Sequence, residues 1–416
     1  MLPASPASRI ADLKRAFAPQ EALVEANRCL FCFDAPCTIA CPTHIDVPRF
    51  IKKIATGNLR GSASTILDAN VLGLSCSRVC PVDILCEGSC VMHRYNRQPI
   101  EIGRLQRHAM EDFYDKGAHW ALPTVEARTR KVACIGAGPA SLACAAELRR
   151  HGFAVTIFDA HPLGGGLNTY GVAEYKFRPN DSQREVDFIR SLGVEIRTGV
   201  SIGVDVSLDQ IEKEFDAIFI GMGLGPTEKL NIPGEDLPNV IDAVSFIAAY
   251  KTAADVRVGR NVAVIGAGNT AIDAAVAARL LGAAEVTIVY RRSEKELPAF
   301  EFEYEHAKLE GVRFLWNVRP ARIESDGIYL IGTTSGSEFQ FACDMVIVAL
   351  GQSKLSQLFG PDRGIRFMNG RVVVNPLTGQ TDNPRYFAGG DCVNGGREVV
   401  DAAAEGKRAG QGIANG

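Results

Sequence analysis

The 416-residue sequence lacks the features that direct a chain to a membrane or to an oxidising compartment. The segment after Met1 has no apolar stretch typical of a signal peptide, and no run of about 18 uncharged apolar residues follows it. A strong charge of one sign is also missing, because the formal net charge is -3. Disulfide bonds, membrane spans and nucleic-acid binding are therefore disfavoured, and we expect a cytoplasmic enzyme.

Cysteine, by contrast, is plentiful, and eight of the 12 cysteines fall between residues 29 and 90. They form two groups, Cys29, Cys32, Cys37 and Cys41, and Cys76, Cys80, Cys86 and Cys90. Proline follows Cys41 and Cys80, and a Cys-Pro that closes such a run is typical of ferredoxins, whose thiolates bind iron-sulfur clusters. We therefore predict two [4Fe-4S] clusters. Structural zinc is the alternative, although it usually uses two Cys-x2-Cys pairs and the second group has none.

The sequence changes in character near residue 118. Before this point, residues 47–54 and 102–114 have helical patterns, and nothing alternates like a strand. Residues 116–130 contain Gly117, Pro123 and several charges, which is typical of a linker. Short apolar runs separated by helical patterns follow, and this order predicts an α/β fold.

The first glycine-rich turn follows a predicted strand at residues 131–135 and precedes a helix and a second strand, residues 154–158. This order is that of a dinucleotide-binding βαβ unit, in which glycines let a pyrophosphate approach the backbone at the helix N-terminus. We expect Asp159, which ends the second strand, to accept hydrogen bonds from the adenosine ribose. The predicted cofactor-binding residues of the turn are Gly136, Gly138, Pro139, Ala140 and Ser141, the last in place of a third glycine.

A second unit of the same kind contains predicted strands at residues 261–265 and 285–290. No acid ends its last strand, and Arg291 and Arg292 stand there instead. Guanidinium groups suit a 2′-phosphate, so we expect NADPH in preference to NADH. The alternative is that one arginine only caps the strand. The predicted cofactor-binding residues of this turn are Gly266, Gly268, Asn269, Thr270 and Asp273.

Two patterns near the C-terminus complete the nucleotide-binding units. An apolar strand ends at Gly351, which we count among the cofactor-binding residues, and Gly390 and Asp391 precede a helical stretch at residues 398–413. Gly-Gly-Asp alone is more often an ordinary turn. With two nucleotide-binding units, however, the chain resembles the flavoproteins with two dinucleotide-binding domains. This resemblance implies that the first nucleotide is FAD and that Asp391 binds its ribityl chain.

The order of all these motifs points to a narrower family. The eight cysteines, residues 102–107, the first glycine turn and Gly164 to Leu167 resemble the NADPH-accepting half of dihydropyrimidine dehydrogenase and the glutamate synthase small subunit. The resemblance covers nearly the whole chain and adds Gly165, Gly166 and Leu167 to the cofactor-binding residues. It implies an α-helical two-cluster domain at residues 1–118, followed by Rossmann-like domains that bind FAD (131–255 and 376–416) and NAD(P)H (256–375).

The same resemblance implies an interleaved set of cluster ligands. Cluster one takes Cys29, Cys32, Cys37 and Cys90, and cluster two takes Cys41, Cys80, Cys86 and the side-chain amide of Gln106. Cys76 is then left over, and the neutral amide should alter the cluster potential. The alternative is that all eight cysteines are ligands. The resemblance also places Lys176 near the flavin, where it would steady the reduced ring; the alternative is a solvated surface lysine.

The implied activity is electron input from NAD(P)H to FAD and then, singly, through the clusters. No side-chain acid or base is required for hydride transfer, and the sequence has no (β/α)8 barrel or amidotransferase domain. We therefore expect a subunit of a dihydropyrimidine dehydrogenase, in a hetero-oligomer with an FMN and iron-sulfur chain that reduces uracil or thymine. The alternatives are a glutamate synthase small subunit, another NADPH:ferredoxin-type oxidoreductase, and a non-enzymatic iron-sulfur redox sensor. Dithiol exchange is not expected, because the other four cysteines stand singly.

Overall fold

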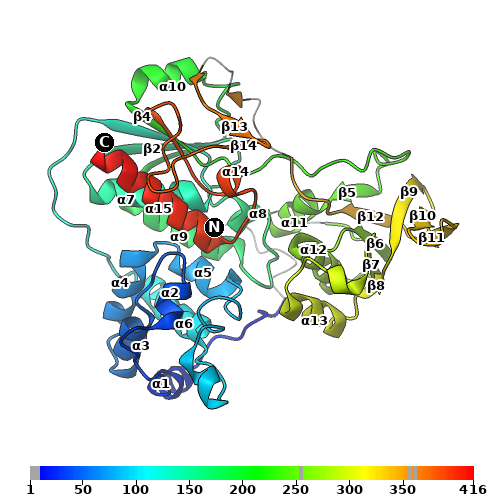
Figure 1. Cartoon of the computed structure of the whole chain (residues 1–416), viewed down its shortest axis with the longest axis horizontal. Helices are drawn as coiled ribbons and strands as arrows, with labels where there is room; N and C mark the ends of the chain where they lie inside the picture. Colours follow the sequence, from blue (N-terminus) through cyan, green and yellow to red (C-terminus); the bar gives the residue numbers. More distant parts are fainter. Residues whose placement is uncertain (1–9, 253–255, 354–357, 360–362) are drawn as a thin grey trace. The chain divides into compact units, whose positions relative to one another are not determined.

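The computed structural model describes residues 10–252, 256–353, 358–359 and 363–416 (Figure 1). The chain forms two units, each built from segments that are distant in the sequence. Unit 1 consists of the start of the chain up to Asp12, Thr169–Pro179 and Gly225–Ser353. Unit 2 consists of Leu13–Asn168, Asn180–Leu224 and Lys354–Gly416. The cysteine-rich region and the first glycine turn therefore belong to the same unit.

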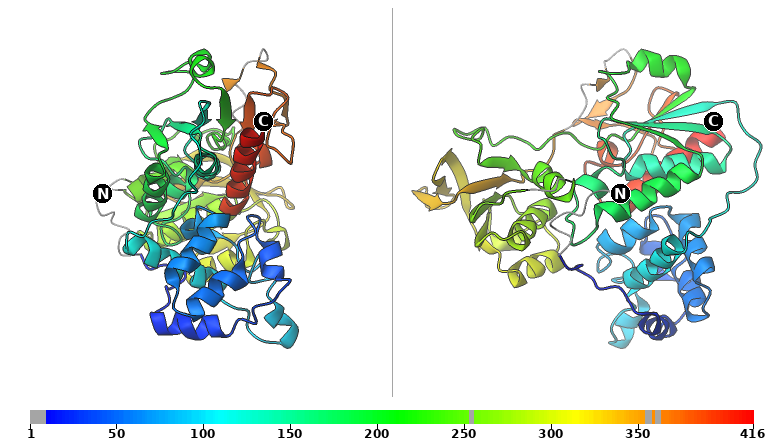
Figure 2. Two further views of the ribbon diagram at one scale, coloured as in Figure 1. Left: turned by 90° about the vertical axis from the view of Figure 1, so that its left-hand side faces the viewer. Right: turned by 180° about the vertical axis from the view of Figure 1, so that it is seen from behind.

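The N-terminal part of unit 2 is helical, and residues 10–130 contain no strand. Figure 2 shows these helices, in blue, as a bundle. Apolar spacing explains the packing, because α3 buries Val47, Phe50, Ile51 and Ile54 on one face and exposes Lys52 on the other. The elements are α1 (Pro19–Asn27), α2 (Pro36–Ala40), α3 (Val47–Ala55), α4 (Leu59–Ala69), α5 (Gly73–Val79), η2 (Val91–Tyr95) and α6 (Ile102–Asp115).

The rest of unit 2 is built on a parallel sheet with the strand order β15-β4-β1-β2-β3. Parallel strands are buried on both faces, which accounts for the continuous apolar runs of β1 and β4. Its strands are β1 (Lys131–Ile135), β2 (Ala154–Asp159), β3 (Glu195–Thr198), β4 (Ala217–Ile220) and β15 (Tyr386–Ala388). Its other elements are α7 (Pro139–Arg150), α9 (Pro179–Ser191), α10 (Leu208–Glu214), β13 (Phe367–Met368), β14 (Arg371–Val372), α14 (Asp391–Asn394) and α15 (Val399–Asn415), while α8 (Leu167–Tyr170) leads into unit 1.

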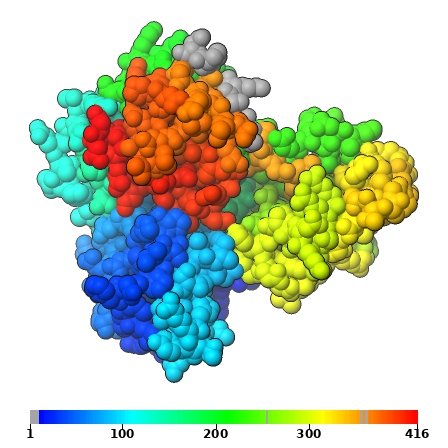
Figure 3. Space-filling view, viewed as in Figure 1, coloured from blue at the N-terminus to red at the C-terminus, as the bar shows by residue number. Residues whose placement is uncertain are grey.

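Contacts within unit 2 join the helical region to this sheet domain. Lys407, on α15, donates hydrogen bonds to the carbonyl oxygens of Asp68 (2.8 Å) and Ala69 (3.1 Å) at the end of α4. Arg150, on α7, donates to the same Asp68 oxygen at 3.1 Å. The space-filling view of Figure 3 accordingly shows the blue N-terminal region directly against the red C-terminal segment.

Unit 1 contains a second parallel sheet, of order β5-β12-β6-β7-β8, and a separate antiparallel sheet, β11-β10-β9. The second glycine turn joins β6 to α12, in the same way that the first joins β1 to α7. Its strands are β5 (Val240–Asp242), β6 (Asn261–Ile265), β7 (Glu285–Val289), β8 (Arg313–Leu315), β9 (Val318–Glu324), β10 (Gly327–Gly332), β11 (Glu338–Ala342) and β12 (Met345–Val348). Its helices are α11 (Ala243–Thr252), α12 (Asn269–Leu280), η3 (Glu294–Glu296) and α13 (Glu301–Leu309).

The predicted fold class, a helical domain followed by two Rossmann-like domains, is confirmed. The prediction that residues 256–375 form the NAD(P)H domain stays a prediction. The bounds of unit 1 differ from those residues, because unit 1 already includes β5, which pairs with β12. Residues 363–375 belong to unit 2 instead, and Ile365 and Val372 pack in the core of that unit. None of the helices in the described ranges is long and apolar enough to span a membrane.

Candidate functional site

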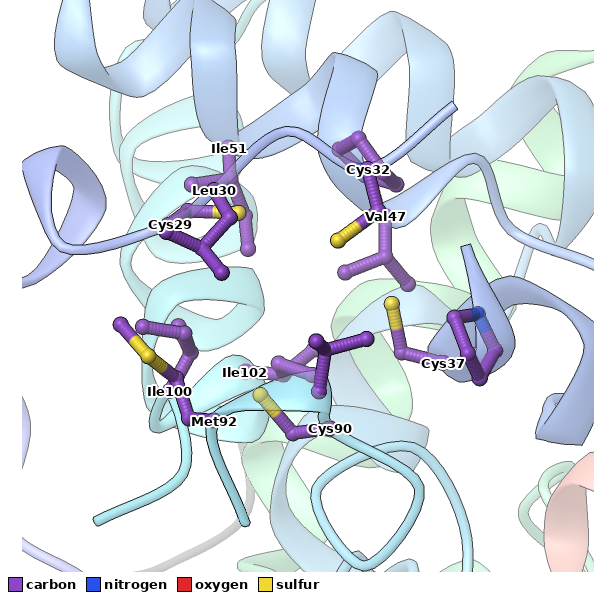
Figure 4. Close-up of a pocket in the computed structure, with 13 residues that line it drawn as sticks. Cys29, Leu30, Cys32, Cys37, Val47, Ile51, Cys90, Met92, Ile100 and Ile102 are labelled. Carbon is purple, nitrogen blue, oxygen red and sulfur yellow. The ribbon is translucent and has the colours of Figure 1, made fainter. Parts of the chain in front are cut away.

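Four cysteines from separate segments of the helical region line an open hollow of about 370 Å³ (Figure 4). Cys29 and Cys32 follow α1, Cys37 lies in α2, and Cys90 precedes η2. Their sulfur atoms surround the hollow, and the rest of the lining is apolar: Leu30, Pro36, Val47, Pro48, Ile51, Val91, Met92, Ile100 and Ile102. The structure thus brings together the four cysteines that the resemblance assigns to cluster one.

The thiols of this hollow are held in a weakly polar environment. Burial raises the pKa of Cys29, and burial together with the nearby Cys29 raises the pKa of Cys37 to about 12. Metal binding at Cys29 and Cys37 would therefore displace the protons of their thiols. In the described ranges no three His, Cys, Asp or Glu side chains are arranged to hold a single ion. The donor set itself, four soft sulfurs around an apolar hollow, fits an iron-sulfur cluster.

A second set of cysteines lies deeper in the helical region. Cys41, Cys76 and Cys80 are buried, and Cys86 is half-buried. The pKa of Cys80 is raised by its hydrogen bond with Cys76, by burial, and by the nearby Cys86 and Cys41. These four thiols are therefore neighbours. Asn70 Nδ2 also donates a hydrogen bond to Cys76 Sγ at 3.1 Å.

Gln106 is buried on α6. Its Nε2 donates a hydrogen bond to the carbonyl oxygen of Gly73 at 2.7 Å. Because only the nitrogen of the amide can donate, this bond also fixes the side of the group on which Oε1 lies. An amide that binds a metal through its oxygen needs that oxygen to be held in a fixed orientation. The choice between Gln106 and Cys76 as the fourth ligand of cluster two stays a prediction.

The first glycine turn is shaped for close approach of a nucleotide. Gly136 has a φ of +90°, and a Cβ there would lie 2.6 Å from the carbonyl oxygen of Gly221. At Gly138 the nearest atom to a Cβ would be 3.8 Å away, so space is left in front of the first turn of α7. Asp159 Oδ2 accepts the backbone N–H of Ala137 at 2.6 Å, which places its carboxylate beside the turn. The arrangement fits a pyrophosphate at the helix N-terminus and a ribose at Asp159.

Other predicted FAD-binding residues lie around this turn. Gly165 donates its backbone N–H to Ala137 O at 2.8 Å, and a Cβ at Gly166 would lie 2.8 Å from Gly138 Cα, so the two loops are in contact. Pro139, Ala140 and Ser141 form the first turn of α7, and Leu167 begins α8. Gly390 packs near Ala140, and burial raises the pKa of Asp391.

The second glycine turn has the same geometry within unit 1. Gly266 has a φ of +121°, whereas nothing lies within 4 Å of a Cβ placed on Gly268. Asn269 Oδ1 accepts the backbone N–H of Phe300 at 3.0 Å, and Thr270 follows it in the first turn of α12. The positive-φ residue Gly351 lies beyond β12. Arg291 and Arg292 are exposed shortly after β7, so their guanidinium groups are accessible to a phosphate.

Lys176 is buried in unit 1, with an exposed fraction of 7%, so its interpretation as a solvated surface lysine is wrong. Its Nζ lies 2.5 Å from Asp273 Oδ1 and 2.6 Å from Glu303 Oε1. Burial lowers the pKa of Lys176, but the two carboxylates outweigh burial and leave that pKa raised. Tyr175 Oη also donates to Asp273 Oδ1, at 2.9 Å. Asp273, predicted to bind the cofactor, thus has a lysine and a tyrosine as its partners.

Sequence reasoning missed Glu303 and Tyr175 in this cluster. Glu303 lies 127 residues after Lys176, in an acidic stretch at the start of α13 that resembles any exposed helix end. Its contact with Lys176 depends on tertiary structure, and no local pattern indicates it.

Two family models match the chain. Residues 7–118 match the family described as dihydropyrimidine dehydrogenase domain II, 4Fe-4S cluster. Residues 130–406, more than half of the chain, match the family described as pyridine nucleotide-disulphide oxidoreductase. The protein is therefore an NAD(P)H-dependent iron-sulfur flavoprotein oxidoreductase with FAD as its flavin.

Several curated proteins are similar over nearly the whole chain. A putative oxidoreductase AegA of Escherichia coli is 35% identical over 95% of the chain, which spans 66% of that protein's length. The glutamate synthase [NADPH] small chain of Halomonas elongata is 34% identical over 98% of the chain and 93% of its own length. The NAD-dependent dihydropyrimidine dehydrogenase subunit PreT of Salmonella typhimurium is 33% identical over 97% of the chain and 96% of its own length.

Solved structures show the same fold at lower identity. Thioredoxin reductase from T. acidophilum aligns with a TM-score of 0.59 at 20% identity, over 69% of the chain and 98% of its own length. A 2-naphthoyl-CoA reductase aligns with a TM-score of 0.60 at 21% identity, over 89% of the chain and 49% of its own length. Together with the family matches, these alignments show that the chain belongs to the pyridine nucleotide-disulphide oxidoreductase family and carries a 4Fe-4S domain of the dihydropyrimidine dehydrogenase type at its N-terminus.

Proposed function

We propose that this protein is the electron-input subunit of a dihydropyrimidine dehydrogenase. It oxidises NAD(P)H and passes electrons to a separate FMN and iron-sulfur subunit, which reduces the 5,6 double bond of uracil or thymine. The observation that carries the proposal is the convergence of Cys29, Cys32, Cys37 and Cys90 on one hollow, in the same unit as the first glycine turn. The PreT proteins, at 33–34% identity and nearly equal length, support the choice of partner.

The residues of the chain bind and orient the cofactors. Bound FAD would supply the chemistry that converts the two-electron hydride of NAD(P)H into single electrons for iron-sulfur clusters. The turn at Gly136 and Gly138 would offer backbone N–H groups to the pyrophosphate of FAD, Asp159 would accept hydrogen bonds from its ribose hydroxyls, and Asp391 would bind its ribityl chain. No side chain of these has to transfer a proton for the hydride step.

We assign cluster one to the cysteines of Figure 4, and cluster two to Cys41, Cys80, Cys86 and Gln106. The fixed amide of Gln106 supports this assignment, because its nitrogen is engaged by Gly73. The hydrogen bond between Cys76 and Cys80 favours the all-cysteine alternative, since it places a fourth sulfur beside those of Cys41, Cys80 and Cys86. Iron content and spectra of ligand variants distinguish the two schemes.

We further propose that NADPH is the preferred coenzyme. Exposed arginines at positions 291 and 292 stand where an acid would select NADH. The related proteins differ on this point, since PreT is named NAD-dependent and the glutamate synthase small chain is named for NADPH.

The second candidate is a glutamate synthase small chain, favoured by 34% identity over 93% of that relative. Purified protein, loaded with FAD and iron, should reduce an artificial dye with NADPH, which a redox sensor without turnover would not do. With an FMN and iron-sulfur subunit of the dihydropyrimidine type it should reduce uracil. With a large amidotransferase chain it should instead make glutamate from glutamine and 2-oxoglutarate, if the second candidate is right. A pull-down from the cytoplasm of the native host identifies the partner directly.

A further inference from the structure

Glu185 is a buried carboxylate that none of the nucleotide or cluster assignments uses. It lies on α9 of the sheet domain, and its exposed fraction is 1%. Its Oε1 accepts two backbone N–H groups, those of Leu74 and Ser75, each at 3.0 Å. The Ser75 hydroxyl donates a hydrogen bond to Oε2. Glu185 thus holds the beginning of α5, which belongs to the helical cysteine-rich region.

Ser75 is held from a second side by Asn168, whose Nδ2 donates to Ser75 Oγ at 2.8 Å. Asn168 lies in α8, which directly follows the loop that contacts the first glycine turn. Two separate segments of the FAD-binding part of unit 2 therefore meet on one buried serine of α5.

The position of α5 matters for the second cluster. Cys80 is the residue at which α5 ends, and the carbonyl of Gly73, its first residue, holds the side chain of Gln106. Cys76 lies within the same helix, so the all-cysteine scheme depends on α5 equally. Any displacement of α5 relative to the sheet domain moves at least two ligands of cluster two.

Burial of Glu185 between α9 and α5 costs desolvation free energy, which argues against an incidental role for this residue. Burial of a carboxyl group is unfavourable unless its oxygens are hydrogen-bonded, and the three donors to Glu185 are all uncharged. Burial raises the pKa of Glu185 to about 8 despite those hydrogen bonds, and Asp181 adds to the effect. Burial and the nearby Glu185 likewise raise the pKa of Tyr114, which Arg184 opposes. A leucine at residue 185 would fill the space with a smaller desolvation cost, but it would leave two N–H groups of α5 unpaired.

We propose that Glu185 is a positioning residue for electron transfer: with Ser75 and Asn168 it fixes α5, and hence the ligands of cluster two, relative to the bound FAD. The inference rests on the proposed electron-input function. It adds a specific expectation, namely that loss of Glu185 impairs the step between flavin and cluster while leaving reduction of the flavin intact. Electrons released by the reduced flavin are the ones that the oxidised cluster accepts, so the step needs no further reactant.

The test compares Glu185→Ala, Glu185→Gln and Asp187→Asn in the protein loaded with FAD and iron. Asp187 is the matched control, because it is an exposed side chain on the same helix and forms a salt bridge with the exposed Arg190. Stopped-flow absorbance follows flavin and cluster reduction by NADPH, and EPR spectra with a redox titration follow each cluster. In Glu185→Ala we expect cluster two to be reduced about tenfold more slowly, with a changed EPR signal, while the rate of flavin reduction and the EPR signal of cluster one stay unchanged.

Glu185→Gln should restore most of the rate, because its amide oxygen can still accept both N–H groups of α5. Should Glu185→Ala fail to fold, Ser75→Ala carries the same test, with a smaller effect in the same direction. Cluster reduction and EPR signals that match the unmodified protein, or equal changes in Asp187→Asn, would overturn the inference. Failure of the unmodified protein to support uracil reduction with its partner would instead count against the proposed function, since the EPR comparison needs no partner.

Discussion

Replacement of Lys176 by methionine should strongly destabilise unit 1. The change removes a buried cation and leaves Asp273 and Glu303 as buried carboxylates without their shared partner. Breaking a buried ion pair in this way costs about 3–5 kcal/mol, because the remaining charge stays desolvated. The hydrogen bond from Tyr175 to Asp273 remains and relieves only part of this cost. We therefore expect the free energy of unfolding of unit 1 to fall by about 3 kcal/mol or more.

The pH dependence of this contribution has a definite sign. The pKa of Lys176 is raised above its ordinary value of 10.5, because the two carboxylates outweigh the opposing effect of burial. A raised pKa in the folded state adds stability that is present below 10.5 and is lost only as pH rises through the folded value. The contribution of the Lys176 charge in the unmodified protein should therefore be constant around neutral pH.

Urea unfolding followed by tryptophan fluorescence measures this effect in unit 1. The chain has two tryptophans, and in a Trp120→Phe background only Trp316 reports. Trp316 stacks on Phe314 with ring centroids 5.2 Å apart, and Tyr304, next to it, lies on the same helix as Glu303.

The matched control is Lys229→Met, which breaks an exposed pair with Asp236 in the same unit and should cost less than about 1 kcal/mol. The reasoning is refuted if Lys176→Met is as stable as the control. Slower flavin reduction in a fully stable Lys176→Met would show that the lysine acts on the cofactor, as the resemblance implied.

Three further outcomes are expected. Changing Arg291 and Arg292 to glutamine should weaken NADPH binding about tenfold or more and leave NADH nearly unaffected, as measured by KM in dye reduction; equal use of both coenzymes by the unmodified protein would contradict this. Cys76→Ser should keep about eight irons per chain while Gln106→Ala perturbs one cluster, and the reverse result would restore the all-cysteine scheme. Asp159→Ala should lower the affinity for FAD about tenfold in a fluorescence titration, and full retention of FAD would exclude its role at the ribose.

Much of the fold could be predicted from the sequence because buried parallel strands give continuous apolar runs. The predicted strand at residues 131–135 and the one at residues 261–265 coincide with β1 and β6. The boundary of unit 1 could not be predicted, because β5 has only three residues and pairs with β12, about 100 residues later. Such a short strand carries no periodicity, and its place in a sheet depends on a distant partner.

In the candidate site, too, local sequence motifs could be predicted, whereas contacts between residues distant in the sequence could not. The glycine turns and cysteine groups are local patterns with a chemical reason for their spacing, and the structure brings four of the cysteines together as the resemblance implied. Glu185 and Glu303 carry no such pattern. Each lies on a helix among other charged residues, and only the fold shows that one meets Ser75 and the other Lys176.

The cysteines outside the helical region indicate where electrons cannot leave the protein. Thioredoxin reductase shares the fold, yet Cys134, Cys144, Cys343 and Cys392 are all buried and stand singly in the sequence. Burial raises the pKa of Cys343 to about 11 and that of Cys392 to about 12, so neither is a thiolate at neutral pH. A dithiol exchange needs an accessible thiolate, whereas these four cysteines are buried. By contrast, the four cysteines around the hollow of Figure 4 are half-exposed, which fits the proposed transfer of electrons from this region to a partner.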